Sequence, residues 1–339
     1  MSRLLEVENL RVSFHSYAGE VKAVRGITFG VDKGETLAVV GESGCGKSVT
    51  AKALMRLFNR TSGEVMPGSK IMFDGIDVMA LNKKELHAFR GAQIGMIFQD
   101  PMTSLDPTMT IGKQVGECLV VHKGISMKEA VKEAVELLRM VEIPNPEERV
   151  KAYPHQLSGG MRQRVVIATA LACNPKLLIA DEPTTALDVT IQAQVLDLLR
   201  NLKEKLGTAI ILVTHDLGIV ADFADRIQVM YAGVIVEEGT KQEIFKECVH
   251  PYTWALLRSI PTEGSSKEAL YSLKGTPPDL LMDQKGCPFA SRCEYCMPIC
   301  KEHAPEFTAK SDTHRAACWL QHPKAPKVER PVGLGGDIR

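Results

Sequence analysis

TLAVVGESGCGKS, at residues 36–48, joins a short apolar run to a glycine-rich loop that ends in Lys47 and Ser48. The run 36–40 is typical of a buried parallel strand, and residues 47–58 have the pattern of a helix. The loop fits the spacing G-x-x-x-x-G-K-[ST], in which backbone N–H groups and the positive end of the helix dipole surround phosphate oxygens. The stretch therefore predicts a phosphate-binding loop in an α/β protein.

Two side chains of this loop have specific expected roles. Lys47 would contact the β- and γ-phosphates of a nucleotide, and the hydroxyl of Ser48 would bind Mg²⁺. Cys45 is most simply a filler, although a thiol at a helix N-terminus can be unusually acidic, so its alkylation would block nucleotide binding. The other residues expected to line the nucleotide are Ser43, Gly44, Gly46 and Val49. The alternative, a chance glycine-rich turn, loses weight because a strand and a helix flank the loop.

The bulk composition favours a soluble cytosolic protein. The 339 residues carry 41 basic and 41 acidic side chains, so there is no broad electrostatic reason to expect a nucleic-acid partner. No apolar run approaches the roughly 20 residues of a membrane-spanning helix. The N-terminus meets charge too early for a signal peptide. Any role at a membrane is therefore expected to require a partner.

Strand and helix patterns alternate through the first two thirds of the chain. Amphipathic strands are expected over 7–14 and 23–31, and buried strands over 94–98, 177–180 and 210–213. Helices are expected over 127–141, 160–173 and 191–206. This alternation predicts a parallel α/β sheet with right-handed crossovers.

Polar side chains follow three of the buried strands. Asp181 and Glu182 end the run LLIADE, where Asp181 can hold Mg²⁺ through water and Glu182 can polarise the attacking water. Gln99 and His215 follow two further strands, and ligands of parallel sheets gather at these carboxyl ends. Taken singly, the two carboxylates could be surface acids. Gln99 and His215 could likewise be structural polar groups whose hydrogen bonds are satisfied within the fold.

The run LSGGMRQR, at residues 157–164, precedes a helix and predicts a second anion-binding helix end. Ser158 can cap that helix, and Gly159 and Gly160 leave backbone N–H groups accessible. Alone, Ser-Gly-Gly is more often an ordinary loop.

The order of these motifs resembles the nucleotide-binding domain of ABC transporters over residues 4–260. The resemblance rests on the phosphate loop, Gln99, LSGGMRQR, LLIADE, the triplet ALD at 186–188, and His215. It implies a P-loop NTPase of ABC type: a RecA-like parallel sheet, an antiparallel β subdomain and a helical subdomain over about residues 100–170. It also implies head-to-tail pairing, with each ATP between the phosphate loop of one chain and the Ser158–Gly160 segment of the other.

The same resemblance implies a role for each site residue. Glu182 would be the general base, and His215 would sense the γ-phosphate. Gln99 would touch Mg²⁺ and couple the site to membrane subunits, and Asp188 would lie at the dimer interface. An aromatic ring near the N-terminus would stack on adenine. Phe14 fits this place best, with Tyr17 as the alternative and a plain core role for Phe14 about as well supported.

Three further stretches resemble the ATPases of dipeptide and oligopeptide importers: FQDPMTSLDP at 98–107, the region from HPYT at 250–253 to Pro261, and the cysteine region from GCPF at 286–289 onward. This implies ATP hydrolysis coupled to import at the cytoplasmic face of the cell membrane. The implied partners are a second ATPase subunit, usually a paralogue, two transmembrane permease subunits and an extracytoplasmic solute-binding protein. The alternatives are import of nickel or another small solute, a soluble ABC ATPase of DNA repair or translation, and an iron–sulfur regulatory protein.

Residues 261–339 are expected to form an irregular, proline-rich C-terminal extension without a large core, ending in a loose tail over 322–339. Its cysteines have the spacing C-x5-C-x2-C-x3-C-x17-C. Four thiolates can hold Zn²⁺ or an iron–sulfur cluster. The resemblance places a [4Fe–4S] cluster on Cys287, Cys293, Cys300 and Cys318, with Cys296 as an extra or a substitute. Zinc or no metal remains the alternative.

Overall fold

The structure is a computed structural model that describes residues 3–58, 63–185, 187–260, 273–331 and 334. Its contacts divide the chain into two compact units. The first unit contains Met1–Leu4, Val31–Glu35 and Ile76–Leu212, and the second contains Leu5–Gly30, Thr36–Gly75 and Val213–Arg339. None of the helices in the described ranges is long and apolar enough to span a membrane.

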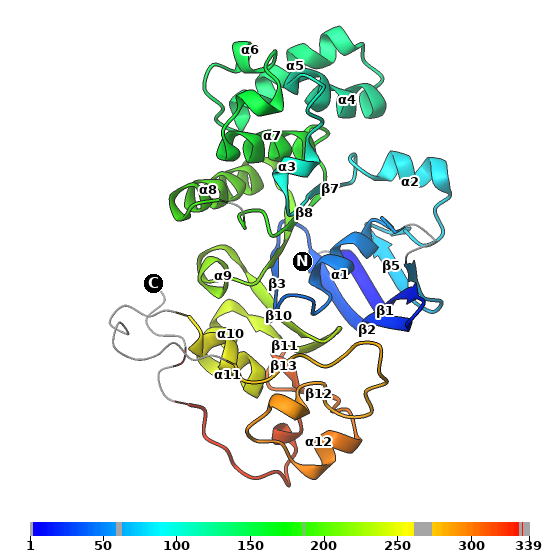
Figure 1. The fold of residues 1–339 in the computed structure, drawn as a ribbon, viewed down its shortest axis with the longest axis vertical. Helices are drawn as coiled ribbons and strands as arrows, with labels where there is room; N and C mark the ends of the chain where they lie inside the picture. The colour runs from blue at the N-terminus through cyan, green and yellow to red at the C-terminus, as the bar shows by residue number, and fades with distance from the viewer. Residues whose placement is uncertain (1–2, 59–62, 186, 261–272, 332–333, 335–339) are drawn as a thin grey trace. The chain divides into compact units, whose positions relative to one another are not determined.

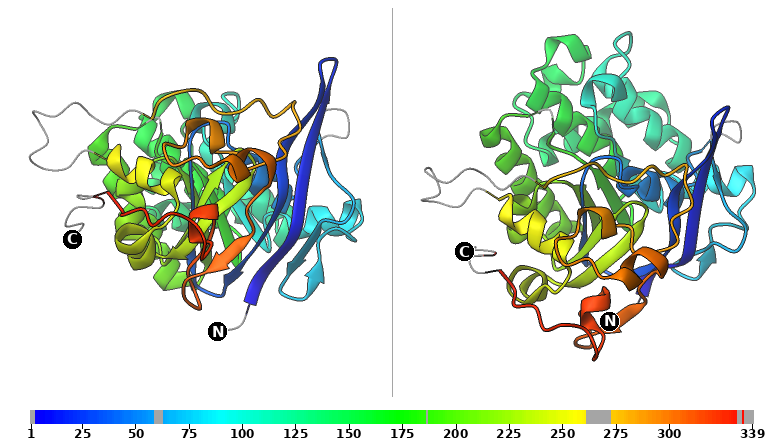
Figure 2. Two further views of the ribbon diagram at one scale, coloured as in Figure 1. Left: turned by 90° about the horizontal axis from the view of Figure 1, so that it is seen from below. Right: turned by 60° about the horizontal axis from the view of Figure 1, so that its bottom comes forward.

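An antiparallel sheet of the second unit carries the N-terminal strands. β1 (Arg3–Ser16) pairs with β5 (Lys70–Phe73) and with β4 (Glu64–Val65), and β2 (Gly19–Asp32) lies on the other side of β1. Buried and exposed side chains alternate along much of β1, as expected for a sheet with one covered face. The long β1–β2 hairpin is drawn in dark blue in Figure 2. The two predicted amphipathic strands are therefore present and longer than expected.

The strand before the phosphate loop, β3 (Thr36–Val40), is buried along its whole length. It pairs in parallel with β10 (Arg226–Tyr231), which pairs antiparallel with β11 (Val234–Thr240). The helix after the loop, α1, covers Lys47–Leu54 and so is shorter than predicted. It ends there because the chain turns at Arg56, whose φ of 51° is left-handed.

The C-terminal extension is largely irregular, as expected, but parts of it are built into the core of the second unit, which corrects the expectation of a segment without a large core. Its strand β13 (Arg315–Ala317) pairs antiparallel with β11 and with β12 (Phe307–Ala309). Phe289 and Leu334 join a buried cluster with Tyr231 and Tyr252. Figure 2 shows the orange strand of the extension beside the yellow-green β11. The other elements of this unit are α9 (Leu217–Phe223), α10 (Lys241–Glu247), α11 (Pro251–Arg258), η2 (Ala290–Arg292), α12 (Pro298–Glu302), β12 (Phe307–Ala309), β13 (Arg315–Ala317) and η3 (Trp319–Gln321).

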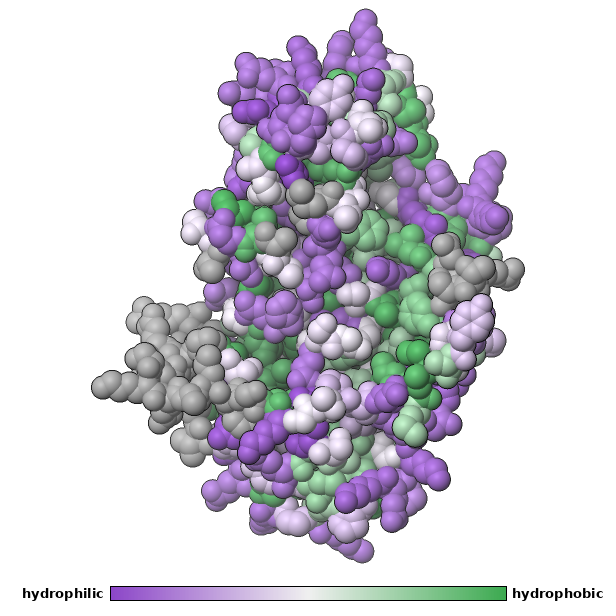
Figure 3. Space-filling model, viewed as in Figure 1, coloured by the Kyte–Doolittle hydropathy of each residue, from purple (hydrophilic) through white to green (hydrophobic). Residues whose placement is uncertain are grey.

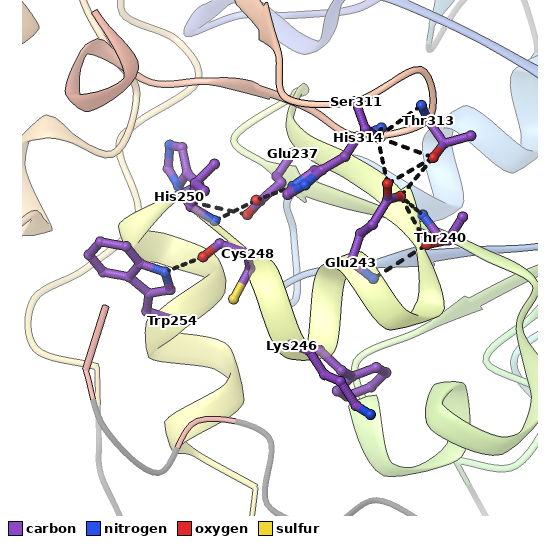
Figure 4. Close-up of polar contacts among 12 residues, drawn as sticks. Glu237, Thr240, Glu243, Lys246, Cys248, His250, Trp254, Ser311, Thr313 and His314 are labelled. Atoms are coloured by element: carbon purple, nitrogen blue, oxygen red, sulfur yellow. Dashed lines mark hydrogen bonds and ion pairs between the residues drawn. The ribbon is translucent and has the colours of Figure 1, made fainter. Parts of the chain in front are cut away.

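A buried polar network also holds the extension (Figure 4). His314 Nε2 lies 2.9 Å from Glu237 Oε1, and the second oxygen of Glu237 accepts from the backbone N–H of His250. Glu243, in the first turn of α10, accepts hydrogen bonds from the hydroxyls of Ser311 and Thr313 in the extension. The loop between β12 and β13 is thus fixed to α10 and β11 by carboxylates.

Glu243 gives this docking a pH dependence. Burial acts to raise its pKa, but hydrogen bonds from Ser311, Thr240 and Thr313 outweigh burial and lower the pKa to about 2. Because the folded pKa lies below the unfolded value of about 4.3, the stabilisation is complete above that pH and is lost as pH falls toward 2. We expect Glu243→Gln to lower the thermal midpoint at pH 7, with a gap from wild type that closes between about pH 4 and pH 2. A difference in thermal midpoint between wild type and Glu243→Gln that stays constant with pH would contradict this prediction.

The first unit contains the remaining buried strands and most helices. β7 (Ile94–Ile97) and β8 (Leu177–Asp181) pair in parallel, with Ile94 opposite Leu177, and β9 (Ala209–Thr214) neighbours β8. Helices α4, α5, α6 and α7 lie together in Figure 1, and α5 has largely hydrophilic exposed residues, as the upper part of Figure 3 shows. The elements are β6 (Ile76–Asp77), α2 (Lys83–Phe89), β7 (Ile94–Ile97), α3 (Pro101–Ser104), α4 (Ile111–Lys123), α5 (Met127–Met140), α6 (Pro146–Arg149), η1 (Pro154–Gln156), α7 (Gly159–Leu171), β8 (Leu177–Asp181), α8 (Val189–Leu206) and β9 (Ala209–Thr214). Helices α3–α7 occupy the range predicted for the helical subdomain.

Candidate nucleotide-binding site

The phosphate loop of the second unit depends on glycines in the left-handed region. Gly46, directly before α1, has a φ of 103°, and a Cβ there would lie 2.5 Å from the carbonyl oxygen of Ala23. Gly41 is similarly confined, because its Cβ would lie 2.1 Å from the carbonyl oxygen of Met230. The two glycines therefore allow the loop to pack against β2 and β10 while Ser43 and Gly44 remain exposed.

Lys47 is buried inside its own loop. Its ammonium donates to the carbonyl oxygens of Gly41, at 2.7 Å, and Glu42, at 2.9 Å. Only 4% of the residue is exposed. The ammonium is thus held within the loop by carbonyls that a phosphate could replace as its partners. Ser48 and Val49 are half-buried in the first turn of α1.

Cys45 is not the acidic thiol that its position suggested. Its residue is 5% exposed, and burial raises the pKa of the thiol despite the nearby ammonium of Lys47. Desolvation therefore outweighs the helix end and the lysine charge. The thiol is a packed group with little thiolate at neutral pH, which fits the filler interpretation.

The two aromatic candidates for adenine stacking differ in their surroundings. The Phe14 ring packs edge-on against Phe58, with centroids 5.6 Å apart. Tyr17, in the turn between β1 and β2, is fully exposed. Phe14 therefore has a position fixed by packing, and Tyr17 does not.

In the first unit, Glu182 and Gln99 are brought together. Asp181 ends β8 and is 2% exposed, and Glu182 follows it with a φ of 47°. The Glu182 carboxylate accepts from Gln99 Nε2 and from Thr185 Oγ1, each at 2.9 Å. A left-handed backbone costs energy for a residue other than glycine, and such strain is concentrated at functional sites. The Glu182 carboxylate is thus aimed and held by residues from two strand ends.

The predicted anion-binding helix end has the expected geometry. Ser158 caps α7 by accepting from the backbone N–H of Met161 at 3.3 Å, and both Ser158 and Gly159 are exposed. A Cβ on Gly160 would lie 2.9 Å from a methyl carbon of Ile191 in α8. Asp188 caps α8 by accepting from the N–H of Ile191, a structural role in addition to the predicted interface role. His215 is exposed directly after β9.

Thiols of the cysteine region lie close enough to raise the pKa values of Cys287, Cys293 and Cys318. Burial and, to a smaller extent, the nearby thiols of Cys287, Cys293 and Cys300 raise the pKa of Cys318 to about 12. Backbone N–H groups two residues ahead donate to the sulfurs of Cys287, Cys293 and Cys318 and lower their pKa values. Cys296 donates its thiol hydrogen to the carbonyl of Met297 at 3.6 Å. Within the described residues, however, no group of three or more His, Cys, Asp or Glu side chains is arranged to hold a metal ion.

Two contacts to the phosphate loop were not predicted. Arg292, beside Cys293, pairs with Glu42, and the hydroxyl of Tyr252 accepts from the Glu42 backbone N–H at 2.8 Å. No local pattern marks either residue as part of the site. The HPYT stretch that contains Tyr252 was singled out only by resemblance.

Comparison with solved structures defines the class of protein. The chain is 30% identical, with a TM-score of 0.62, to the dimeric ATP-binding cassette MJ0796 in a post-hydrolysis state with ADP and Pi, over 70% of this chain and 99% of that one. It has the same TM-score and identity to cbiO1 of Clostridium perfringens, over 73% and 92%. The sequence profile of the ABC transporter family matches residues 24–185. The fold is that of an ABC-type ATPase, as predicted.

Full-length relatives define the family. The profile of the oligopeptide/dipeptide transporter C-terminal region matches residues 236–300. The chain is 58% identical to the oligopeptide transport ATP-binding protein OppD of Bacillus subtilis, over 100% of this chain and 95% of that protein. It is 53% identical to the dipeptide transport ATP-binding protein DppD of the same organism, over all of both chains. The chain belongs to the family of ATP-binding proteins of oligopeptide and dipeptide ABC transporters.

Proposed function

We propose that this protein hydrolyses ATP to ADP and phosphate to energise a membrane importer of dipeptides or oligopeptides. The full-length similarity to OppD and DppD supports the substrate class, and the Glu182 site carries the enzymatic part. The profile match in the C-terminal region favours peptides over nickel or another small solute. Family membership leaves no support for a DNA-repair or translation ATPase or for an iron–sulfur regulator.

The chemistry we propose is positioning and charge stabilisation. Lys47 leaves the carbonyls of Gly41 and Glu42 to bind the β- and γ-phosphates. Ser48, Gln99 and Asp181 supply the oxygen ligands that suit Mg²⁺, Asp181 through water. Glu182 accepts the proton of the attacking water, and His215 contacts the γ-phosphate. The ring of Phe14 stacks on adenine.

Two protomers complete each site in this proposal. Ser158, Gly159 and Gly160 are accessible at the start of α7, where backbone N–H groups can bind the γ-phosphate held by a partner cassette. ATP then binds the closed pair better than the open pair, and that difference in affinity drives closure. The partners we infer are a second ATPase subunit, a paralogue by resemblance, two permeases at whose cytoplasmic face this chain sits, and a solute-binding protein.

Uptake measurements test the substrate class. We expect cells or proteoliposomes with the complete transporter to accumulate a labelled dipeptide or tripeptide only with ATP, and unlabelled peptide but not Ni²⁺ to compete. If Ni²⁺ competed for uptake and unlabelled peptide did not, the transported substrate would be the metal and not a peptide. ATP hydrolysis without any associated permease would contradict the transport role.

We further propose that Cys287, Cys293, Cys300 and Cys318 hold a [4Fe–4S] cluster. Neighbouring thiols of the region raise the pKa values of Cys287, Cys293 and Cys318, so these sulfurs lie near other thiols, and the same three sulfurs accept backbone N–H groups, as cluster thiolates do. The described residues contain no group arranged to hold a metal ion, so the choice of a cluster over Zn²⁺ rests on the resemblance. When bound, the cluster would cross-link the extension.

Iron analysis tests the cluster. We expect protein purified without oxygen to contain about four iron and four sulfide per chain and to absorb visible light. Cys318→Ser should lose most of the iron, whereas Cys296→Ser should retain it, because the resemblance does not count Cys296 among the four ligands. Equal iron content in wild type and Cys318→Ser would exclude this cluster site. One zinc per chain in place of iron would show that the cysteines hold a single Zn²⁺ ion.

A further inference from the structure

Arg292 links the cysteine region to the phosphate loop through a two-pronged ion pair. Its Nη1 lies 2.5 Å from Glu42 Oε2, and its Nη2 lies 2.9 Å from Glu42 Oε1. The Arg292 side chain is only 3% exposed, and that of Glu42 is 28% exposed. A bidentate pair of this kind is both strong and specific in geometry, and burial shields it from salt.

The guanidinium of Arg292 has a partner for each of its five N–H donors. Besides the two bonds to Glu42, Nη1 donates to the Tyr231 hydroxyl, Nε to the carbonyl of Lys274, and Nη2 to the carbonyl of Leu273. A guanidinium offers five donors, so none is left to rotate toward another group. Arg292 is therefore fixed by the extension and presents a rigid fork to the loop.

Glu42 is also held through its backbone. Its N–H donates to the hydroxyl of Tyr252, whose residue is fully buried and whose ring packs on Tyr231 with centroids 4.6 Å apart. Phe289, three residues before Arg292, packs on both tyrosine rings. Arg292 thus holds the side chain of Glu42, and an aromatic cluster that Phe289 of the extension helps to build holds its backbone.

Glu42 connects Arg292 to Lys47 through direct contacts. The ammonium of Lys47 donates to the carbonyl of Glu42, so the segment that Arg292 holds also carries a partner of the phosphate-binding lysine. The position of Arg292 in turn depends on the cysteine region, because η2 (Ala290–Arg292) lies between Cys287 and Cys293. A continuous path of direct contacts leads from the cysteine region to the phosphate-binding lysine.

We propose that Arg292 is a positioning residue for nucleotide binding, which acts by holding the phosphate loop through Glu42. The extension is then part of the nucleotide site, because the loop keeps its binding shape only while Arg292 is in place. The inference rests on the proposed function only in taking this loop as the ATP site. Disturbing the cysteine region should change ATP affinity by the same path.

The test compares two arginines that join the extension to the rest of the second unit. Arg292 pairs with Glu42, and Arg315 of β13 pairs with Glu238 of β11 at 2.6 Å, so Arg315→Gln is a matched control. We expect Arg292→Gln to raise the Kd of a fluorescent ATP analogue about tenfold, and Arg315→Gln to change it less than about twofold. Equal effects of the two variants would mean that Arg292 only docks the extension, and would overturn the proposal.

A double-mutant cycle and a rescue separate positioning from misfolding. If Arg292 acts through Glu42, Arg292→Gln should weaken nucleotide binding much less in a Glu42→Gln background. Arg292→Lys keeps the charge but loses the fork, so it should recover only part of the affinity. Additive effects in the cycle would overturn the proposal. Failure of the wild-type protein to bind the analogue would instead refute the proposed ATP site.

Discussion

Replacing Glu182 by Gln should lower ATP turnover by about 100- to 10,000-fold, the range that general acid–base catalysis contributes. The amide cannot accept the proton of the attacking water. It has nearly the same shape, and its oxygen can still accept from Gln99 and Thr185, as the carboxylate does at 2.9 Å. Nucleotide affinity should therefore remain close to that of wild type. Phosphate release and equilibrium binding of ATP, measured on the same preparation, check both parts.

The stalled variant should also accumulate an ATP-bound closed pair, because a protein that cannot hydrolyse ATP cannot reopen by that route. Size-exclusion chromatography with the partner cassette, with and without Mg-ATP, measures this. Glu133→Gln is the matched control, since Glu133 is an exposed carboxylate of α5 that pairs with Lys123 at 2.9 Å. Turnover of Glu182→Gln equal to that of the control would remove Glu182 from the base role.

Local signals in the sequence sufficed for the strand-end and loop residues of the site. The run before Gly41 and the run before Asp181 are strands because each is short and continuously apolar, and both are buried along their whole length. Ser158 could be placed as a helix cap from its own chemistry and the helix that follows. In each case the signal and the element lie within a few residues of each other.

Contacts between distant parts of the chain could not be predicted in this way. Glu42 and Arg292 are separated by 250 positions, and Glu237 and His314 by 77. The proline-rich composition after residue 260 suggested an irregular segment, yet β13 extends the sheet beyond β11. A short edge strand has too few residues to show a periodic pattern. Whether it forms depends on pairing with the neighbouring strand more than on its own residues. The alternative of an acidic Cys45 thiol fails for a related reason, because the burial that raises its pKa comes from tertiary packing.

Replacing Lys47 by Ala should weaken ATP binding itself by about 10- to 100-fold, the value of one to two charge-assisted hydrogen bonds to phosphate. The ammonium is already inside the loop, with Gly41 and Glu42 carbonyls as partners. Its removal leaves the buried carbonyl of Gly41 without this donor, and the carbonyl of Glu42 keeps only the long bond from the Cys45 N–H at 3.4 Å, so the loop should lose shape as well as charge. Titration with radiolabelled ATP measures the affinity, and Lys70→Ala is the control, since Lys70 pairs with Glu8 on the surface.

Lys47→Ala and Arg292→Gln both affect the phosphate loop, but they remove different contacts. Lys47→Ala removes the group that we propose binds phosphate, so its effect should persist whether or not Glu42 is held by Arg292. Arg292→Gln leaves the ammonium in place and disturbs only the segment that carries it. The effect of Lys47→Ala should therefore be the larger, and it should fall mainly on nucleotides that have β- and γ-phosphates. Undiminished ATP affinity in Lys47→Ala would show that the backbone N–H groups of the loop bind phosphate without the lysine.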